Sequence, residues 1–370
     1  MKFCIITHVK HKKNGEQYFA YGPYVREMNL WLNVEDQLIV VASLSNNVKI
    51  DNIDLAYIYP NIKFIQIPEI EFTSFFKCIK SIIRIPQILL GILKGVKLSD
   101  HIHLRCPGNI GLLGCMVQTF FPSKKKTAKY AGNWDPKSLQ PLTYKLQRWI
   151  LSNTLITKNM QTLVYGDWEN QTQNIKPFFT ASYWSKDILP VSEKVIHGKL
   201  KLIYVGSLIP SKNPLLSIKV ARALIDTGRE IEFNFYGEGS ERKSLEDYIS
   251  VNNLFDSVFL HGNVNPGKLI EAYQEAHFLI FISKSEGWPK VVAESMFWGC
   301  VPVTTAVSCV PWMLEKGSRG YLVQENENMI VDVISKISQV EYKKKSQNAS
   351  TWSRQFTLDK FELEVKNLLK

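Results

Sequence analysis

The sequence predicts an α/β protein in which two parallel sheets are each covered by helices. Short apolar runs alternate with helical patterns along most of the 370 residues, and this alternation is typical of parallel strands joined by crossover helices. The length and the hydrophobic content of 45% suffice for two or three domain cores. Residues 172–199 have no periodicity and contain two prolines. We therefore predict one domain over 1–190 and a second over 191–355.

The first half is expected to contain a series of buried strands with helices between them. The strands are predicted at residues 3–7, 37–43, 63–67, 101–105, 127–131 and 162–165, with a shorter extended segment at 53–59. A helix is expected from Tyr21, and residues 72–96 form a basic amphipathic pattern interrupted at Pro86. Asp135 before Pro136 is a standard start signal, so we expect Asp135 to cap a helix that follows.

The second half repeats the alternation from Lys201. Its strands are predicted at residues 201–205, 232–236, 258–260, 278–282 and 301–303. Asn213 and Pro214 are expected as the N-cap and the first residue of the helix after the first of these strands. Further helices are expected after Gly239, up to Ala276, and in a short segment that Gly299 ends.

Two carboxylates, Glu286 and Glu294, stand on either side of a loop-to-helix junction. Pro289 suits the first helical position, so Glu286 lies in the loop and Glu294 about one and a half turns into the helix. Both side chains can then face the mouth of the loop. The backbone N–H groups of Trp288 and Lys290 would have no helical partner, which favours an anion site. Taken alone, the two glutamates could equally be ordinary solvated charges.

The stretch SKSEGWPKVVAESMFWGCVPVTT resembles the E-x7-E signature of the family-4-type (group 1) retaining glycosyltransferases. The resemblance is specific from Lys201 to Val323 and diffuse before that. It implies a GT-B fold, in which two Rossmann-like domains face each other across a cleft, with the donor on the second and the acceptor on the first. It also implies that a C-terminal helix over 356–370 packs back on the first domain. In the family the first glutamate contacts the donor sugar and the second contacts the ribose.

The stretch VGSLIPSK resembles the family's V-G-R-L-x-x-x-K, whose arginine and lysine hold the leaving diphosphate. Lys212 matches the lysine, Gly206 allows a tight turn above the sheet, and Ser207 stands where the arginine is expected. Either Lys290 or Arg105 replaces that cation, or phosphate binding is weaker than usual. The resemblance therefore implies Glu286, Lys212 and Arg105 as catalytic residues. The implied donor-binding residues are Gly206, Ser207, Lys212, Tyr236, Gly237, Glu286, Gly287, Trp288, Pro289, Lys290, Val291 and Glu294.

On the acceptor side the resemblance implies Gly22, Arg105 and Asp135. Gly22 matches the second glycine of a family Gly-Gly loop, and Tyr21 replaces the first. Arg105 ends a predicted strand at a position where relatives often place a histidine or arginine. Each has a plain alternative, since Gly22 can be a simple turn, Arg105 structural and Asp135 a helix cap.

Charge divides the two halves of the sequence. Residues 63–148 carry 14 Lys and Arg against 4 Asp and Glu, whereas residues 191–370 are nearly balanced, with 22 against 21. Such asymmetry indicates an anionic partner, either a membrane surface or a nucleic acid. Basic residues Lys77, Lys80 and Arg84 beside apolar ones, and the run 124–126, suit an anionic membrane surface. A soluble acceptor, with the lysines merely solvated, is the alternative.

Other classes of protein fit the sequence less well. The longest apolar stretch, 85–96, contains Pro86 and Lys94 and is too short to cross a bilayer. The first residues read as a buried strand rather than a signal peptide. The six cysteines form no C-x-x-C pair, which favours reduced core thiols. We expect a cytoplasmic protein at the inner face of the cell membrane, with no structural metal, no cofactor and no nucleic acid partner.

The sequence thus predicts a retaining glycosyltransferase for hexosyl or N-acetylhexosaminyl transfer from a nucleotide-diphosphate sugar. The predicted acceptor is a glycan hydroxyl, lipid-linked, in bacterial surface polysaccharide biosynthesis. The alternative is a non-catalytic GT-B-like protein that binds an acidic polymer or nucleic acid, and the missing arginine at Ser207 is its best support. Against it, no aromatic residues interleave with the lysines in a known nucleic-acid motif.

Overall fold

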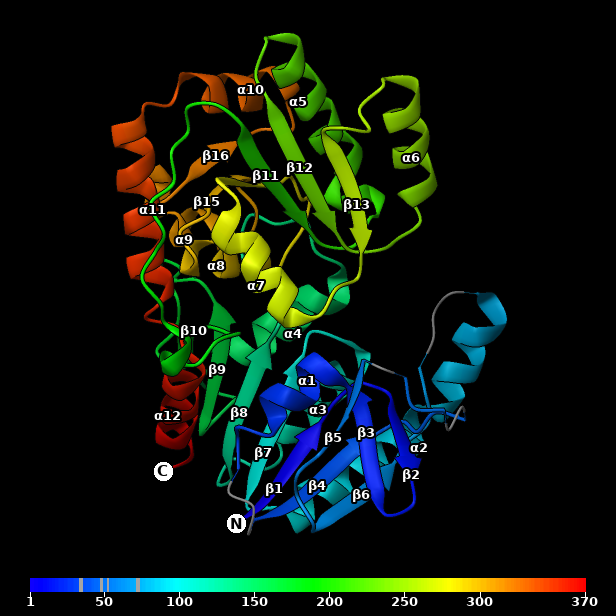
Figure 1. Ribbon diagram of the computed structural model, residues 1–370. Helices are drawn as coiled ribbons and strands as arrows, with labels where there is room; N and C mark the ends of the chain where they lie inside the picture. The colour runs from blue at the N-terminus through cyan, green and yellow to red at the C-terminus, as the bar shows by residue number, and fades with distance from the viewer. Residues whose placement is uncertain (33–35, 47–48, 52, 71–73) are drawn as a thin grey trace. The chain divides into compact units, whose positions relative to one another are not determined.

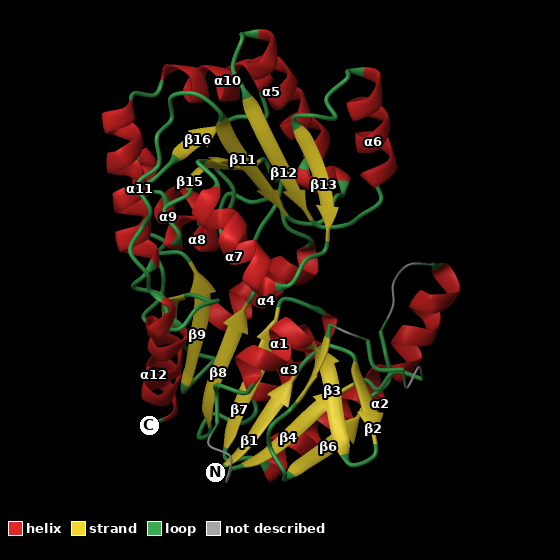
Figure 2. Ribbon diagram, viewed as in Figure 1, coloured by secondary structure: helices red, strands yellow, loops and turns green. Residues whose placement is uncertain are grey.

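The computed structural model describes residues 1–370 except 33–35, 47–48, 52 and 71–73. The chain divides into two compact units. Unit 1 consists of Met1–Phe178 and Phe361–Lys370, and unit 2 of Phe179–Lys360. Each unit has one large parallel sheet with helices on both faces, as Figures 1 and 2 show. The α/β class and the doubly wound sheets predicted from the sequence are confirmed.

The large sheet of unit 1 has the order β10-β9-β8-β7-β1-β4-β6, and all its neighbours are parallel. Its strands are β1 (Lys2–Ile6), β4 (Gln37–Ala42), β6 (Ile62–Gln66), β7 (His101–Cys106), β8 (Lys125–Tyr130), β9 (Met160–Tyr165) and β10 (Ile175–Phe178). Strand β1 pairs with β4 on one side and β7 on the other. The strand order therefore reverses beside β1, and sheets of this kind bind ligands at the carboxyl ends of the strands near such a reversal.

The helices of unit 1 follow the predicted alternation, with one misplaced start. They are α1 (Gly22–Met28), α2 (Phe75–Leu98), α3 (Asn109–Gln118), α4 (Leu142–Ser152) and the part of α12 (Leu358–Leu369) that falls in this unit. The prediction of a helix directly after Pro136 is wrong, because residues 136–138 form a turn and α4 begins later.

Helix α2 has a buried half and an exposed half. The chain stays helical through Pro86, so the predicted interruption is wrong. Beyond it Ile88, Ile92 and Val96 are fully buried against the sheet. Before it Phe76, Ile82 and Ile83 are 83%, 59% and 72% exposed, and this half extends away from the sheet in Figure 1. Phe72 and Thr73, where the pattern was predicted to begin, lie outside the described residues.

Of a small antiparallel sheet, β2-β3-β5, only β5 was predicted, as part of the extended segment 53–59. Its strands are β2 (His11–Asn14), β3 (Gln17–Tyr21) and β5 (Asp54–Ala56). Strands β2 and β3 form a hairpin in which Asn14 pairs with Gln17, and Gly15 supplies the positive φ of 58° that the two-residue loop requires. The strand β2 is hard to predict because it consists mostly of polar residues, although the dipeptide Asn14-Gly15 is typical of turns.

The sheet of unit 2 has the order β13-β12-β11-β14-β15-β16, again all parallel. Its strands are β11 (Leu200–Val205), β12 (Ile231–Tyr236), β13 (Val258–Gly262), β14 (Phe278–Phe281), β15 (Val301–Thr305) and β16 (Tyr321–Val323). The helices are α5 (Pro214–Asp226), α6 (Arg242–Val251), α7 (Pro266–Glu275), α8 (Lys290–Phe297), α9 (Val310–Met313), α10 (Glu327–Lys336) and α11 (Gln339–Ser353). The predicted start of α5 at Pro214 is confirmed, whereas Pro289 is the N-cap of α8 rather than its first residue.

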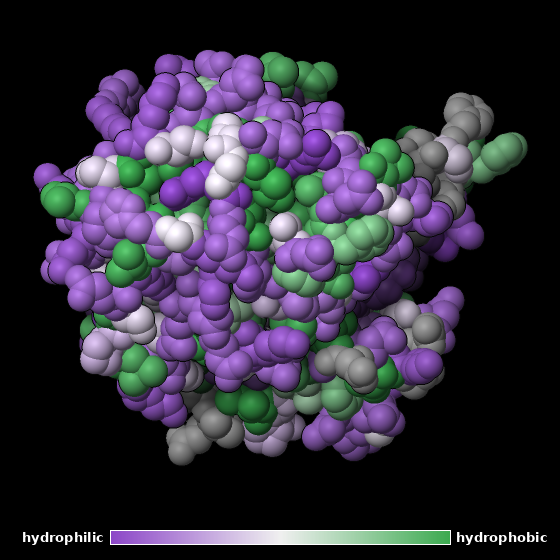
Figure 3. Space-filling model, turned by 45° about the horizontal axis from the view of Figure 1, so that its top comes forward, coloured by the Kyte–Doolittle hydropathy of each residue, from purple (hydrophilic) through white to green (hydrophobic). Residues whose placement is uncertain are grey.

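The surface shown in Figure 3 and the burial of the cysteines can be compared with the predictions from composition. Figure 3 shows hydrophilic residues over most of the face that it presents, with hydrophobic residues in separate small patches. No helix in the described ranges combines the length and hydropathy needed to cross a membrane. The cysteines whose side chains are described are buried free thiols, at positions Cys4, Cys106, Cys115, Cys300 and Cys309.

Candidate donor site

Two glycine turns form the floor of the candidate site at the carboxyl ends of β11 and β12. Gly206 follows β11 and donates its N–H to the carbonyl of Tyr236, at 3.0 Å. Gly237 follows β12 with a φ of 138°, and a Cβ there would come within 2.0 Å of the Gly206 oxygen. Only glycine fits such a contact. The predicted donor residues Gly206, Ser207 and Gly237 therefore lie in adjoining turns, with the Ser207 side chain exposed.

The predicted catalytic residues Lys212 and Glu286 are brought together in this unit. Lys212 ends a short 3-10 helix after β11, and Glu286 lies in the loop after β14. The Lys212 ammonium donates a hydrogen bond to Glu286 Oε1 and lies 5.2 Å from the centre of the Phe281 ring. The two side chains are 20% and 11% exposed. A cation and a carboxylate thus pair at the edge of the sheet, within reach of solvent.

Glu294, predicted to bind ribose, is held inside unit 2 by two hydroxyl groups. It lies on α8 and accepts hydrogen bonds from Ser182 Oγ at 2.5 Å and from the Tyr273 hydroxyl at 3.3 Å. Burial, with the nearby Glu294 carboxylate, raises the pKa of Tyr273 well above its ordinary value, so this hydroxyl stays protonated and can donate. Glu294 is therefore an oriented carboxylate rather than a solvated one.

The loop between the two glutamates is fixed by hydrogen bonds and by aromatic packing. Ser308 Oγ donates to the carbonyl of Gly287, at 2.8 Å. The Trp288 ring packs against Trp312 and Trp352, with ring centres 6.1 and 6.4 Å apart. Trp312 also packs against Trp352, so the three rings form one aromatic cluster. Pro289 precedes α8, and Lys290 and Val291 form the partly exposed first turn, where no side chain caps the helix.

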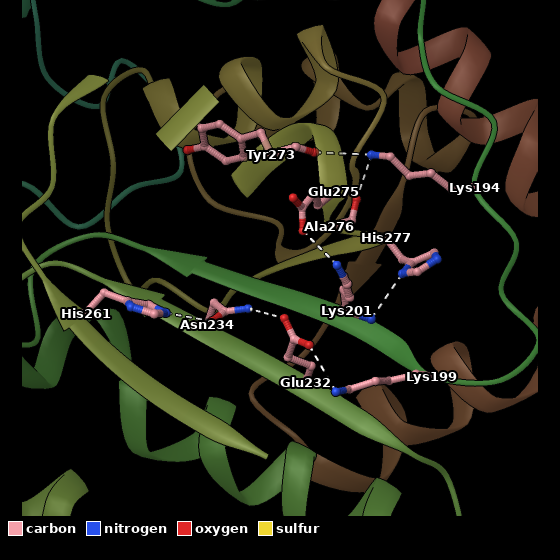
Figure 4. A network of polar contacts seen from close by, with 10 residues as sticks. All are labelled: Lys194, Lys199, Lys201, Glu232, Asn234, His261, Tyr273, Glu275, Ala276 and His277. Carbon is pink, nitrogen blue, oxygen red and sulfur yellow. Dashed lines mark hydrogen bonds and ion pairs between the residues drawn. The ribbon is translucent and has the colours of Figure 1, made fainter. Parts of the chain in front are cut away.

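Tyr236, another predicted donor residue, lines a small polar cavity between the sheet and α7. The cavity has a volume of about 180 Å³, and Figure 4 shows the polar contacts around it. Lys201 bonds Glu275 at 2.7 Å, and the Tyr236 ring stacks on His261 with centres 4.7 Å apart. The Asn234 amide contacts His261 at 2.6 Å. Because its lysines and glutamates pair with one another, this network joins α7 to the sheet.

Each predicted acceptor residue has hydrogen-bond partners within unit 1. Arg105 bonds the buried carboxylate of Glu27 at 2.5 Å, and Lys129 bonds the same carboxylate at 2.8 Å. Gly22 donates its N–H to the Ile53 carbonyl at 2.9 Å, and a Cβ there would come within 2.4 Å of that oxygen. Asp135 accepts the N–H of Lys137 at 2.8 Å in a local turn.

A pocket at the strand reversal of unit 1 contains residues that the sequence reasoning missed. Its volume is about 400 Å³. Residues that line it include His8, Lys10, Glu69, Gly108, Asn109 and Tyr144. Burial and the Arg105 cation lower the pKa of His8, which favours the neutral imidazole, and Lys10 pairs with Glu69 at 2.8 Å. The sequence feature that points to His8 is its position directly after the first predicted strand, because functional groups gather at the carboxyl ends of strands in such sheets.

The match to a family falls on the unit that holds the paired glutamate and lysine. Residues 185–355 match the family model of the glycosyl transferases group 1. The match covers slightly less than half of the chain, which is similar to this family over that segment. The segment contains Lys212, Glu286 and Glu294, so the resemblance seen in the sequence is confirmed at the level of this family.

Curated relatives match parts of the chain. An uncharacterized glycosyltransferase of Methanocaldococcus jannaschii is 25% identical over 171 residues, 45% of this chain and 46% of that protein. The poly(ribitol-phosphate) alpha-N-acetylglucosaminyltransferase of Staphylococcus aureus is 30% identical over 139 residues, 37% of this chain and 27% of that protein. The alignments thus span about half and about a quarter of these relatives.

Solved structures share the fold over the whole chain. The sucrose-phosphate synthase of Thermosynechococcus elongatus superposes with a TM-score of 0.65 at 16% identity, covering 100% of this chain and 98% of that one. Anabaena HepE in complex with UDP superposes with a TM-score of 0.68 at 10% identity, covering 100% and 98%. At these identities the likeness concerns the fold alone, and it supports the GT-B fold predicted from the sequence.

Proposed function

We propose that the protein is a retaining glycosyltransferase that uses a nucleotide-diphosphate sugar. The observation that carries the proposal is the Lys212–Glu286 pair at the carboxyl edge of the unit 2 sheet, beside the Gly206 and Gly237 turns. Parallel sheets bind nucleotides at this edge, and the pair lies inside the matched family segment. HepE, with the same fold, was crystallised with UDP-glucose, which makes UDP-hexoses and UDP-N-acetylhexosamines the first donors to test.

The geometry suggests how the leaving group is stabilised. When the donor binds, its diphosphate competes with Glu286 for the Lys212 ammonium, and the uncapped N–H groups at the start of α8 add a second anion-stabilising element. Glu286, released from the lysine, then positions the sugar and stabilises its developing positive charge. The bond from the anomeric carbon to the phosphate oxygen breaks, and the acceptor oxygen bonds that carbon on the same face. A phosphate oxygen of the leaving group takes the acceptor proton.

Other donor contacts follow from the placement of the remaining residues. Glu294, already oriented by Ser182 and Tyr273, binds the ribose hydroxyls, and Tyr236 with Gly237 frames the base. Lys290, in the first turn of α8, is the cation of unit 2 that replaces the family arginine missing at Ser207. These contacts need no metal ion or cofactor, so transfer is expected to persist in the presence of EDTA.

For the acceptor we propose a lipid-linked glycan at an anionic membrane surface, as in bacterial surface polysaccharide assembly. Support comes from the exposed half of α2, where Phe76, Ile82 and Ile83 lie on the surface near Lys80 and Arg84. Each basic residue near an anionic leaflet contributes about 1 kcal/mol, enough for reversible association. The protein is then peripheral to the inner face of the cell membrane, with the acceptor hydroxyl delivered to unit 1.

A donor panel tests the assignment most directly. Release of labelled sugar from UDP-, GDP- and ADP-sugars, with and without a glycan acceptor, should show turnover for one nucleotide class. The alternative of a non-catalytic protein for an acidic polymer predicts binding of that polymer and no release from any donor. Vesicle sedimentation tests the acceptor proposal separately, because binding should rise with anionic lipid and fall when Lys80 and Arg84 become serine.

A further inference from the structure

The amino-terminal edge of the unit 1 sheet carries lysines of two kinds. Helices that follow parallel strands end at this edge, where their last carbonyls carry partial negative charge. Lys124 donates to the Val96 carbonyl at the end of α2, at 2.6 Å. Lys126 is buried and donates to the carbonyls of Gln118 and Phe121 at the end of α3, at 3.3 and 3.1 Å. These two lysines of the run 124–126 are therefore explained as helix caps.

The other lysines at this edge line an open cavity of about 840 Å³ along the beginnings of β7 to β10. In Figure 1 the arrowheads of these strands point away from this edge. Within the described ranges of the chain, five lysines line the cavity and no aspartate or glutamate does. They are Lys125, Lys126, Lys158, Lys176 and Lys370. Lys158 and Lys176 are exposed and form no ion pair within the part of the chain that the structure describes.

The lysine charges that stay free in this cavity determine which ligands can bind there. Lys126 is already bonded to carbonyls, and Lys125 donates to the main-chain oxygen of Lys370. The positive charge that remains therefore comes chiefly from Lys158, which precedes β9, and from Lys176 on β10. In the register of these two adjoining strands Lys176 lies several residues farther along the sheet than Lys158, so the two ammonium groups can contact successive anions of one chain. Thr154 and Gln173 line the same cavity and can donate hydrogen bonds to oxygen.

We propose that this cavity is a binding site for phosphate groups, in the form of a phosphomonoester or phosphodiester chain. Ammonium groups bind phosphate oxygens as point charges, and among the described residues no acidic side chain of the lining compensates Lys158 and Lys176. The site is separate from the carboxyl edges of both sheets, where the transfer chemistry is assigned. It holds a phosphate-bearing ligand away from the reacting centre, and it does not depend on the proposed transferase activity.

The test measures binding of short-chain inorganic polyphosphate to the full-length protein by isothermal titration. The cavity variant is Lys158→Gln with Lys176→Gln, and the matched control is Lys63→Gln with Lys145→Gln, which removes the same charge from exposed positions of unit 1 outside the cavity. We expect at least about tenfold weaker binding for the cavity variant, since two charges next to phosphate are removed. The control should change affinity by less than twofold. Arginine at Lys158 and Lys176 should restore binding.

Equal weakening in both variants would overturn the proposal, because attraction would then reflect net charge alone, and so would unchanged binding in the cavity variant. Vesicles of phosphatidylglycerol with phosphatidylcholine distinguish the source of the phosphate. If the cavity variant loses vesicle binding together with polyphosphate binding, the ligand is a lipid headgroup, and if it loses only polyphosphate binding, the ligand is a soluble phosphate chain. Glu286→Gln serves as the independent check, since it should abolish transfer without changing polyphosphate affinity.

Discussion

The two units place ionic clusters near the carboxyl ends of their strands, but the clusters differ in burial and balance. In unit 2 one cation, Lys212, pairs with one carboxylate, Glu286, and the side chains are 20% and 11% exposed. In unit 1 two cations, Arg105 and Lys129, share the carboxylate of Glu27, and their side chains are 13%, 1% and 8% exposed. A pair that solvent reaches can be opened by a charged ligand, whereas a buried cluster resists opening.

The comparison shows that a charged residue at the carboxyl edge of a parallel sheet does not by its position alone form a ligand-binding site. Arg105 ends a strand in the position predicted for an active-site cation, yet its guanidinium bonds Glu27 and lies 5.7 Å from the Tyr24 ring. Lys129 also lies 4.9 Å from the Phe361 ring. These contacts make the unit 1 cluster part of the core of that unit.

The largest expected effect is on the stability of unit 1. Glu27→Gln leaves two cations without their buried carboxylate, and breaking a buried pair of this kind costs about 3–5 kcal/mol. Denaturant unfolding, followed by amide exchange in unit 1, should show this loss. Glu286→Gln, in the partly exposed pair, should change the stability of unit 2 by less than about 1 kcal/mol. Similar losses in the two variants would remove the contrast between the clusters.

The next effect is on transfer. Glu286→Gln and Lys212→Ala should each lower the transfer rate by about 10²–10³-fold, because each removes a charged group placed to act on the reacting sugar diphosphate. Circular dichroism should report an intact fold in both. Lys284→Ala is the matched control, an exposed lysine two residues before Glu286 whose ammonium lies 3.9 Å from Glu325. Rates within a few-fold of the unmodified protein for both site variants would exclude the enzyme assignment.

A smaller effect concerns donor affinity. Glu294→Ala removes a charged hydrogen-bond acceptor, and losing its bond to ribose should weaken donor binding by about 1.5–3 kcal/mol. Titration with UDP and UDP-glucose measures this loss. Tyr273→Phe removes only one of the two hydroxyls that orient Glu294, so its effect should be smaller. An affinity that Glu294→Ala leaves unchanged would show that this carboxylate does not contact the nucleotide.

Sequence reasoning predicted the strands and the individual glutamates better than the pairs that side chains form. Lys212 and Glu286 were each singled out, but their contact depends on the parallel pairing of β11 with β14, in which Leu202 lies beside Phe278. No local pattern specifies that pairing. The same holds for Glu27, on α1, which meets Arg105 and Lys129 from β7 and β8.

The lysine run 124–126 shows a second limit of the sequence. Its residues look equivalent as a basic cluster, and together they were predicted to suit a membrane surface. In the fold Lys124 and Lys126 bond the last carbonyls of α2 and α3, and only Lys125 belongs to the exposed lysines of the cavity. Where a helix ends relative to a strand is a tertiary property, so composition overestimated the charge available to a partner.

The smallest expected effect is a rise in folding stability with pH, which involves one buried lysine in each unit. Burial lowers the pKa of Lys126 in unit 1 and of Lys194 in unit 2, each to about 8 from the ordinary 10.5. Above pH 8 the unfolded chain therefore binds more protons than the folded one, and stability should rise with pH. Between pH 8 and 9 each lysine should add about 1 kcal/mol. Denaturant midpoints read separately in each unit by amide exchange measure this rise.

Substituting Lys126 and Lys194 one at a time shows how much each contributes to the rise in stability with pH in its own unit. Lys126→Met should flatten the pH dependence of unit 1 alone, and Lys194→Met that of unit 2 alone, since in each case the titrating group is gone. Both variants also lose bonds to helix carbonyls, Lys194 to Ala276 at 2.7 Å among others, so their stability should be lower at every pH. Lys145→Met, at an exposed position of α4, is the control and should leave both slopes unchanged. A rise in unit 1 that persists in Lys126→Met would show that another group titrates there.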